Sequence, residues 1–518
     1  MKLNPIELEV FKNRFRSICE EMGVTLCRSS FSPNIKERQD FSCAIFDPHG
    51  NLVAQAAHIP VHLGSMPLSV RAAIAAFKLQ RGDAVVLNDP YSGGTHLPDI
   101  TLVQPVFFHN GRKPVFYVAN RAHHSDVGGQ SPGSMPLADH LEQEGVVIRP
   151  TLFQKRGWLN EPWLKAFLKQ VRSPAERRAD LLAQQSANRI GIMRLQELID
   201  AWGQRKILTA MLAYQAYEEN ITRKALKKIP DGTYRFEDYL DNDGISSSPI
   251  TIATKIIIHR GRVIVDLRES APQVKGPVNA TFAITLSAVA YVFRCMVLEL
   301  TGEDCLSLKP IMLKTKKGTV VDARYPAPVA GGNVETSQRI VDVLFGALAK
   351  TLPDLIPAAS QGTMNNLALG GAGFTYYETI AGGMGAGPKG NGDNGIHTHM
   401  TNTLNTPIEA LESELPLQIT RYSLRKNSGG RGRFRGGDGL IREFHFLKPA
   451  HLSLLTDRRR FAPYGLKGGQ AGMPGKNLLL RRGKIIPLPS KVELAVQKGD
   501  HLRLETPGGG GFGKYKKS

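Results

Sequence analysis

Cysteine is scarce in this sequence, and so are the marks of an exported or membrane-embedded chain. The 518 residues contain five cysteines, an odd number, and no two of them have the C-x-x-C spacing. This pattern argues against a disulfide framework and favours a reducing compartment. The first residues contain no basic stretch followed by an apolar run, and no stretch approaches the apolar length that a membrane span needs. We therefore expect a cytoplasmic protein that does not enter a membrane.

The sequence also has fewer acidic than basic residues. Its 46 Asp and Glu residues and 66 Lys and Arg residues give a formal net charge of +20. Such a balance suits a nucleic acid, an anionic surface or substrate, an acidic partner, or simply a solvated basic surface. The stretch from Arg421 to Arg442 contains an Arg-Gly-Gly pattern found in nucleic-acid-binding segments. It lies between apolar strand-like runs and contains Asp438, which favours a structured glycine loop over an RNA binder.

Capping signals and hydrophobic periodicity outline the elements of the chain. Asn4-Pro5-x-Glu7 opens an amphipathic helix that Gly23 is expected to end. Ser173-Pro174-x-Glu176 opens a long helical segment, 174–228, which Pro230-Asp231-Gly232 interrupts. Further expected elements are a hairpin over 41–56, a helix over 68–79, strands over 84–87, 100–108 and 114–120, a strand meander over 234–241, 250–259 and 263–267, and a helix over 281–300.

The expected fold class is therefore α+β, in a mixed multi-domain chain. We place an N-terminal α/β metal-binding region at residues 1–229, which includes the helical segment. A β-rich, glycine-loop-rich region at residues 230–518 would complete the active-site cavity. The length and the 42% share of hydrophobic residues are sufficient for buried cores.

Two polar segments follow one another at the ends of consecutive expected strands. The loop NDPYSGGTHLPD contains His96 and Asp99, and the segment RAHHSD contains His123, His124 and Asp126. Adjacent strand ends would bring these side chains together. Imidazole and carboxylate groups are the donor set of a catalytic divalent metal ion, with one position left open for water. The sequence therefore predicts a metal site here.

A plainer interpretation exists for each of these residues. A His-x-x-Asp pair is more often a hydrogen-bonded loop pair than a metal site. Adjacent strand residues face opposite ways, so only one of His123 and His124 is expected to be a ligand. Asp40 suits a turn or a cap, and His58 and His62 are interpreted as loop polar residues rather than pocket residues.

A second glycine-rich segment, Gly331–Arg339, contains Glu335 and runs into an apolar helix. Backbone N–H groups at such a helix start can bind an anion, and the alternative is a tight turn with a capped helix. It is not a P-loop, because no Gly-Lys-Ser/Thr follows, and no other convincing nucleotide loop is present. We therefore do not expect the chain itself to bind ATP. His397 and His399 lie on the same side of an extended segment and suit a metal, a substrate or cross-strand pairing.

Long motifs run through nearly the whole chain. They are NDPYSGGTHLPDITLVQPVF, RAHHSDVGG, VAGGNVETSQRIVDVLFGALA, GTMNN, YYETIAGGMGAG, HTHMTNTLNTPIEALE, SGGRGRFRGGDGLIREF and TPGGGGFG. Through them the chain resembles the hydantoinase B/oxoprolinase family. That family includes the B-type subunit of N-methylhydantoinases, the corresponding half of 5-oxoprolinase and of caprolactamase, and more distantly the large acetone carboxylase subunit.

The resemblance implies a metal-dependent B-type subunit that opens a cyclic amide, namely a hydantoin, 5-oxoproline or a lactam. A hydantoinase A-type partner subunit would first use ATP-Mg to phosphorylate the carbonyl oxygen, in a hetero-oligomer. The implied cofactor is one divalent transition metal, Zn or Mn, with Fe as a further candidate. The matching positions are Asp40, His96, Asp99 and His123 for the metal, and His124, Asp126 and Glu335 for catalysis.

The implied chemistry is consistent with the substrate class. Resonance makes a lactam a poor electrophile, whereas a phosphorylated oxygen is a good leaving group. Water on a divalent metal, with a pKa near ~7, would supply hydroxide. The family is chemically broad, so a subunit of an ATP-dependent carboxylase of the acetone carboxylase kind is the alternative, because fold alone does not decide the substrate.

Overall fold

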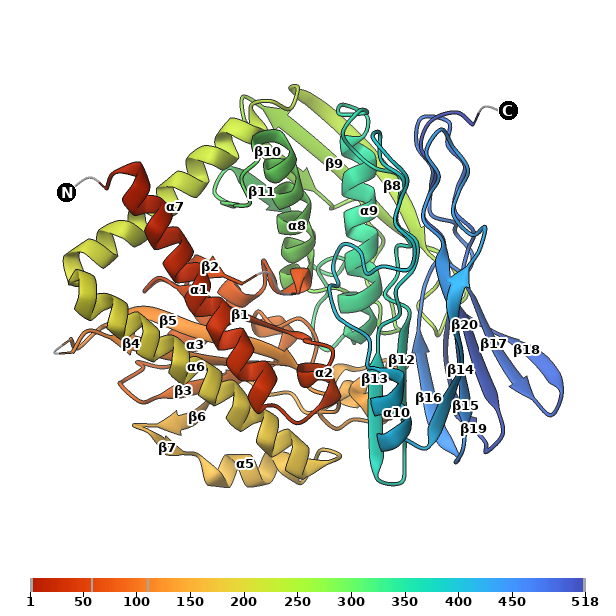
Figure 1. Cartoon of the computed structure of the whole chain (residues 1–518), viewed down its shortest axis with the longest axis horizontal. Helices are drawn as coiled ribbons and strands as arrows, with labels where there is room; N and C mark the ends of the chain where they lie inside the picture. Colours follow the sequence, from red (N-terminus) through yellow and green to blue (C-terminus); the bar gives the residue numbers. More distant parts are fainter. Residues whose placement is uncertain (1–2, 57–58, 110, 516–518) are drawn as a thin grey trace.

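The structure, a computed structural model, describes residues 3–56, 59–109 and 111–515 (Figure 1). Its first half contains a seven-stranded sheet in the order β2-β1-β5-β4-β3-β6-β7, and all neighbouring strands run antiparallel. The strands are β1 Phe41–Phe46, β2 Leu52–Gln55, β3 Ala84–Leu87, β4 Asp99–Phe107, β5 Pro114–His123, β6 Thr151–Lys155 and β7 Trp158–Leu159. The α+β class of the chain is confirmed, but this antiparallel region is not the α/β arrangement that we expected.

Helices cover both faces of this sheet. The helices of the first half are α1 Pro5–Ser29, α2 Pro33–Lys36, α3 Met66–Ala76, α4 Leu141–Glu144, α5 Glu161–Leu168, α6 Pro174–Trp202 and α7 Gln204–Leu226, with 3-10 turns η1 Pro60–His62, η2 Pro90–Ser92 and η3 Pro132–Ser134. Cys43 and Ile45 of β1 pack with α1, α6 and α7, whereas Ala44 and Phe46 pack with α3 on the other face. This alternation follows from the two-residue period of a strand.

Helix α1 confirms the predicted capping signal but not the predicted end. The Asn4 side chain accepts a hydrogen bond from the Glu7 backbone N–H, and the Glu7 carboxylate accepts one from the Asn4 N–H. The helix then continues through Gly23 to Ser29. Its buried side chains pack along α6, and this tertiary packing outweighs the cost of a glycine in a helix interior.

The helical segment predicted at 174–228 consists of two helices. Gly203, with a φ of 77°, separates α6 from α7. Ser173 precedes α6 as expected but does not cap it, because its own φ is 54° and its side chain makes no capping hydrogen bond. The predicted break is confirmed, since α7 ends at Leu226 and the next strand begins at Gly232.

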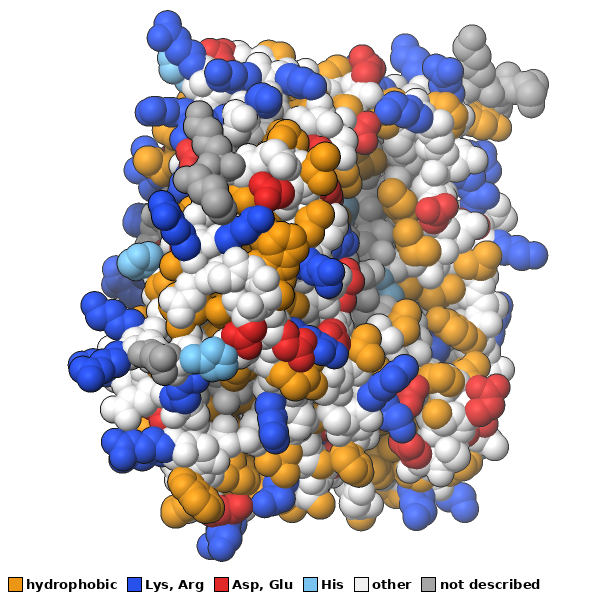
Figure 2. Space-filling model, turned by 60° about the vertical axis from the view of Figure 1, so that its left-hand side comes forward, with side chains coloured by type: hydrophobic (Ala, Val, Ile, Leu, Met, Phe, Trp, Pro, Cys, Tyr) orange, Lys and Arg blue, Asp and Glu red, His pale blue; other side chains and the backbone are white. Residues whose placement is uncertain are grey.

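Lys and Arg side chains are dispersed over the face of the molecule that Figure 2 draws. On the face drawn in Figure 2 they lie between acidic and hydrophobic side chains rather than in one patch. Many basic side chains of the protein form ion pairs, as Arg194 does with Glu21 and Glu197. The net charge of +20 therefore does not form a single basic region on this face.

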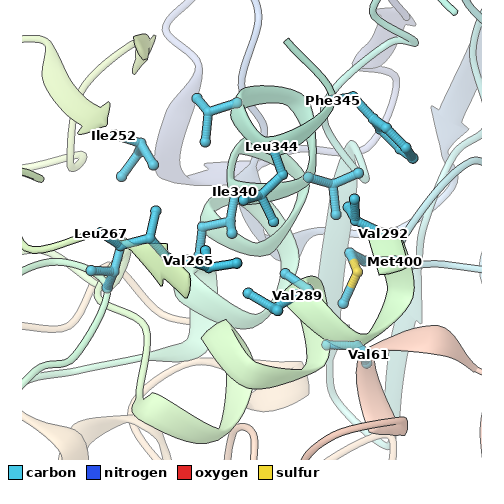
Figure 3. Close-up of a cluster of buried hydrophobic side chains, with 14 of the residues drawn as sticks. Val61, Ile252, Val265, Leu267, Val289, Val292, Ile340, Leu344, Phe345 and Met400 are labelled. Atoms are coloured by element: carbon cyan, nitrogen blue, oxygen red, sulfur yellow. The ribbon is translucent and has the colours of Figure 1, made fainter. Parts of the chain in front are cut away.

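A four-stranded sheet in the order β11-β10-β9-β8 begins the second half. Its elements are β8 Gly232–Leu240, β9 Ile250–His259, β10 Arg262–Asp266 and β11 Ile311–Lys314, with helices α8 Phe282–Thr301 and α9 Ser337–Leu348 packed on it. The antiparallel β8-β9-β10 meander was predicted, and β11 adds to it in parallel with β10. Figure 3 shows Val265 of this sheet, Val289 of α8 and Ile340 of α9 in one core, which Val61 of η1 joins from the first half.

Helix α8 corrects one expectation. Among the described residues it is long and apolar enough, by length and composition, to cross a membrane, although the sequence was expected to contain no such stretch. Of its most apolar window, 61% is buried, and its side chains belong to the core shared with β9, β10 and α9. This burial is typical of the core helix of a globular domain.

Two antiparallel sheets, ordered β13-β12-β16-β19 and β14-β15-β20-β17-β18, complete the β-rich second half. The elements are β12 Asn366–Gly371, β13 Phe374–Glu378, α10 Ile408–Glu414, β14 Leu417–Arg425, β15 Gly439–Phe446, β16 Ala450–Leu455, β17 Lys476–Arg481, β18 Lys484–Leu488, β19 Lys491–Val496 and β20 His501–Glu505. Leu452 and Leu454 of the first sheet share a core with Phe444 and Leu502 of the second.

Glycine-rich loops pack against one another at one end of these sheets. The Gly430 N–H donates to the Gly509 carbonyl and the Gly509 N–H donates to the Gly437 carbonyl, each at 2.9 Å. A Cβ on Gly437 would lie 1.8 Å from the carbonyl oxygen of Asp393, so only glycine fits there. The Arg-Gly stretch is thus a structured loop, as predicted.

Candidate metal centre

His96, Asp99 and His123 meet at one end of the seven-stranded sheet. Asp99 begins β4 and His123 ends β5, and the two are cross-strand neighbours in the antiparallel register. His96 lies in the loop that leads into β4. One possible ligand atom of each side chain lies within 4.8 Å of those of the other two. The structure therefore brings these three predicted residues together.

Three of the four ring nitrogens of this cluster lack a hydrogen-bond partner in the described part of the chain. Both nitrogens of His96 and the Nε2 of His123 have no hydrogen-bond partner among the described residues, although these residues are only 0% and 2% exposed. A buried polar atom without a partner costs about 1–3 kcal/mol, so such atoms call for an explanation. The His96 Nε2 also lies 3.3 Å from the Asp99 Oδ1. Two imidazoles with unpartnered nitrogens and an adjacent carboxylate fit a divalent transition metal.

The electrostatics of the cluster favour ligand binding. Burial would raise the pKa of Asp99, but His96 and His62 hold this pKa well below its usual range. The Asp99 Oδ2 also accepts a hydrogen bond from the Thr95 hydroxyl. Burial lowers the pKa of His123 well below its usual range, so its ring is neutral at pH 7. An ionised carboxylate and a neutral imidazole are the forms that bind metals.

His62 belongs to the site, contrary to our interpretation of it as a loop polar residue. Its Nε2 lies 3.3 Å from the Asp99 Oδ2, and its Nδ1 lies 2.8 Å from the Ser42 hydroxyl of β1. It is 1% exposed, and burial lowers its pKa. The available signal was a single polar residue inside the apolar turn IPVHLG. His58, weighed together with it, lies outside the described residues.

Asp40 lies on the wall of the small cavity that Asp99, His62 and His123 also line. Its carbonyl accepts the His123 N–H at 3.0 Å, which extends the pairing of β1 with β5. Burial raises the pKa of Asp40 to about 6, although Arg38, 3.9 Å away, opposes this shift. The three mutually close side chains do not include it, so the structure places Asp40 beside the cluster rather than within it.

His124 and Asp126 point away from the cluster. The His124 Nε2 lies 2.9 Å from the Gln184 side-chain oxygen of α6. The Asp126 carboxylate accepts hydrogen bonds from two backbone N–H groups of its own loop and from Arg172. Of the two adjacent histidines, His123 faces inward. The structure therefore does not bring His124 or Asp126 to the proposed metal site.

Glu335 is connected to the cluster through two other side chains. It is fully buried in the π-helical turn η4 (Gly332–Thr336), where its Oε1 accepts a hydrogen bond from the Asn366 amide at 3.1 Å. The Tyr377 hydroxyl donates to the Asn366 Oδ1 at 2.7 Å, and the Tyr377 ring stacks on His123 with centroids 4.4 Å apart. Burial raises the pKa of Glu335 to about 8. Glu335 thus contacts the cluster indirectly, through Asn366 and Tyr377.

Asn34 and Arg38 complete the surroundings of His123, and sequence reasoning missed Asn34 entirely. The Asn34 amide lies 3.0 Å from the His123 Nδ1. Arg38 donates to the Asn34 Oδ1 at 3.3 Å and to the Tyr377 carbonyl at 2.9 Å. These contacts join residues 34–38 to a strand more than 300 positions later, and no local pattern in the sequence predicts such a meeting.

The segment Gly331–Arg339 is neither an anion cradle nor a tight turn. It starts α9 with a buried π-helical turn. The Gly332 N–H donates to the Pro277 carbonyl at 3.0 Å, and the Asn333 N–H donates to the Val329 carbonyl at 3.2 Å. Because these N–H groups are engaged, they are not available to a phosphate.

A family model described as hydantoinase B/oxoprolinase matches residues 4–515. The chain belongs to the hydantoinase B/oxoprolinase family. Among the relatives in this family, 5-oxoprolinase 1 of Arabidopsis thaliana is 41% identical over 98% of this chain and 42% of its own length. The B-type subunit of a putative D-/L-hydantoinase from a Pseudomonas species is 30% identical over 99% of this chain and 90% of its own. The chain spans about two fifths of the length of the 5-oxoprolinases that it matches.

Two solved structures share the fold of this hydantoinase B/oxoprolinase chain. The ATP-dependent caprolactamase of Pseudomonas jessenii superposes with a TM-score of 0.92 at 26% identity, covering 99% of this chain and 92% of that one. A nucleotide-free acetone carboxylase superposes with a TM-score of 0.87 at 17% identity, covering 98% and 76%. At 17% identity the second likeness shows the fold alone. The resemblance inferred from the sequence motifs is confirmed.

Proposed function

We propose that the chain is the metal-dependent B-type subunit of an ATP-dependent cyclic amide hydrolase. It would open the ring of a hydantoin, 5-oxoproline or a larger lactam after a partner has phosphorylated the carbonyl oxygen. One observation carries the proposal, namely the unpartnered, buried nitrogens of the His96–Asp99–His123 cluster. This cluster occurs in a family whose relatives include proteins named 5-oxoprolinase and a B-type hydantoinase chain, and an ATP-dependent caprolactamase shares the fold.

The donor set of His96, Asp99 and His123, with Asp40 on the cavity wall beside it, fits one divalent transition metal. Zn and Mn are the first candidates and Fe is a further one, because imidazole and carboxylate ligands suit all three. Such an ion, when bound, acts as a Lewis acid and lowers the pKa of water.

The neighbouring side chains of the protein orient and shield this cluster. His62 lies between Asp99 and the Ser42 hydroxyl, so it fixes the orientation of the carboxylate. The Tyr377 ring covers one face of His123 and excludes water there. Glu335, whose pKa burial raises to about 8, is protonated at neutral pH. It holds the side chain of Asn366, whose oxygen accepts the Tyr377 hydroxyl. We assign these residues positioning roles.

The phosphorylation step is assigned to a partner. No glycine loop with the features of a P-loop occurs in the part of the chain that the structure describes, and the segment before α9 has engaged N–H groups. A hydantoinase A-type subunit that uses ATP-Mg is the proposed partner, in a hetero-oligomer. An enclosed site would protect the phosphorylated amide from bulk water. The carboxylase alternative is weaker, because its structural support is a likeness of fold at 17% identity.

The test is reconstitution of the chain with its A-type partner. The complex is incubated with ATP-Mg and with hydantoin, 5-oxoproline or caprolactam, and ring-opened product is measured by mass spectrometry. We expect ring opening that requires ATP and both subunits. The rate should fall by at least about 100-fold in His96→Ala, because mutating even a residue that only supports a metal ligand lowers activity by about 10–100-fold. Carboxylation of a ketone with bicarbonate, without ring opening of any amide, would establish the alternative instead.

A further inference from the structure

The cavity beside the metal cluster is too small to hold a cyclic amide. Its volume is about 20 Å³, and a single water molecule needs about 10–15 Å³ of such space. Pockets that bind small molecules typically measure roughly 300–1,000 Å³. The space next to Asp99 and His123 thus has room for about one water molecule, and the ring of a substrate must be received next to it.

A larger cavity of about 650 Å³ adjoins this space. Thr401 lines both cavities. Met400 and Thr403 face the small cavity, and His399 and Asn402 face the large one, so this segment forms the wall between them. Figure 3 shows Met400 in the core beside α8 and α9, the two helices that also supply part of the wall of the large cavity.

The interior of the large cavity is mainly apolar, with neutral hydrogen-bonding groups. Tyr291 of α8 and Phe345 of α9 form one wall. His397 adds no charge to the lining, because burial lowers its pKa to about 3. The charged side chains among its lining are Glu299 and Lys389, which pair with each other at 3.0 Å and are 48% and 80% exposed. The interior therefore suits an uncharged ring with N–H and C=O groups.

We infer that this cavity, which we call the ring chamber, binds the cyclic amide. The amide end lies toward Thr401 and the metal cluster, and the carbon atoms of the ring lie against α8 and α9. The inference rests on the proposed function and narrows its substrate to a small ring of about five to seven members without a charged substituent. A hydantoin or a lactam meets this requirement, whereas 5-oxoproline carries an ionised carboxylate at neutral pH. The inference also separates substrate binding from metal binding, because no ligand of the cluster lines the ring chamber.

Gly387 offers a direct test. It lines the ring chamber, and a Cβ at this position would meet no atom within 4 Å. Gly387→Phe therefore fills space without displacing the backbone, and Gly387→Ala is the matched control. In the reconstituted complex we measure kcat/KM for caprolactam and hydantoin, together with bound metal. We expect Gly387→Phe to lower kcat/KM at least about tenfold, and more for the seven-membered ring than for the five-membered one. Gly387→Ala fills less of the cavity and should lower kcat/KM less than Gly387→Phe does, and the metal content should be unchanged in both.

Unchanged kcat/KM for both rings in a metal-loaded Gly387→Phe complex would overturn the inference while leaving the proposed function intact. A wild-type complex that opens no cyclic amide would contradict the proposed function, and the ring chamber with it. If Gly387→Phe does not fold, Gly390→Phe replaces it, because Gly390 lines the same cavity and is equally open at its Cβ.

Discussion

Buried histidines at this site differ in what their nitrogens contact. Each ring nitrogen of His62 has a neighbour, the Ser42 hydroxyl or the Asp99 carboxylate. His96 and the Nε2 of His123 have no hydrogen-bond partner among the described residues. The difference separates a histidine that orients its neighbours from histidines whose donor atoms are free for a ligand. The buried carboxyl group of Glu335 also has one oxygen without a hydrogen-bond partner among the described residues.

The ionisation of Glu335 makes the free energy of unfolding depend on pH. Burial and the nearby Asp457 raise its pKa from 4.5 to about 8, although Lys491 and Arg459 oppose this shift. Between about pH 4.5 and 8 the folded state therefore holds a proton that the unfolded state has released, so stability falls as the pH rises. Glu335→Gln removes this titration while keeping the shape. Urea unfolding of the metal-free chain should show a fall between pH 5 and pH 8 that is smaller in the variant by at least about 1 kcal/mol. Equal falls in both proteins would contradict this assignment.

The sequence predicted part of the site because strand ends can be located locally. Alternating and apolar runs place Asp99 and His123 at consecutive strand ends, and the structure pairs them directly. The same reasoning could not rank His62 above an ordinary loop residue, because its role depends on Ser42 and Asp99 meeting it from two other elements. Tyr377 was missed for the same reason, since it stacks on a residue 254 positions earlier.

At the scale of elements, the effect of a glycine on a helix or a loop depends on the residues that pack around it. Gly23 sits inside α1 because packing along α6 outweighs its low helix propensity. Gly203, by contrast, ends α6 with a positive φ of 77°, which glycine adopts without strain. Sequence patterns predicted the existence and type of most elements, but the effect of a glycine depended on its tertiary neighbours. The loops 428–439 and 508–511 are the extreme case, because their order comes from contact with each other.

A matched pair of alanine substitutions tests the packing of these loops. A Cβ at Gly437 would lie 1.8 Å from the Asp393 carbonyl oxygen, whereas a Cβ at Gly390 would meet no atom within 4 Å. Gly437→Ala must push two backbones apart, and we expect it to lower the free energy of unfolding by more than about 2 kcal/mol. Gly390→Ala should change it by less than about 0.5 kcal/mol. Urea denaturation of the two variants checks this, and similar stabilities would show that the loops are not closely packed.

At the scale of the whole molecule, the site depends on both halves of the chain. The first half supplies His96, Asp99 and His123 from one end of its sheet. The second half supplies Tyr377 and Thr401 to the wall of the small cavity that Asp99 and His123 also line. The predicted boundary near residue 230 remains a prediction, but residues from both sides of it line this cavity. The sequence could not predict this closure in detail, because it depends on contacts between residues more than 200 positions apart.

Metal content of the purified chain tests the central claim most directly. Elemental analysis is made on the wild type, on His123→Ala, and on His124→Ala as the matched control, because these adjacent histidines face opposite ways. We predict about one transition metal per chain in the wild type and in His124→Ala, and less than about a tenth of that in His123→Ala. Loss of a residue that only supports a metal ligand already lowers metal affinity by about 10–100-fold, so loss of a ligand should lower it at least as much. A wild type that binds no metal after reconstitution with Zn or Mn, or metal that stays in His123→Ala, would contradict the account.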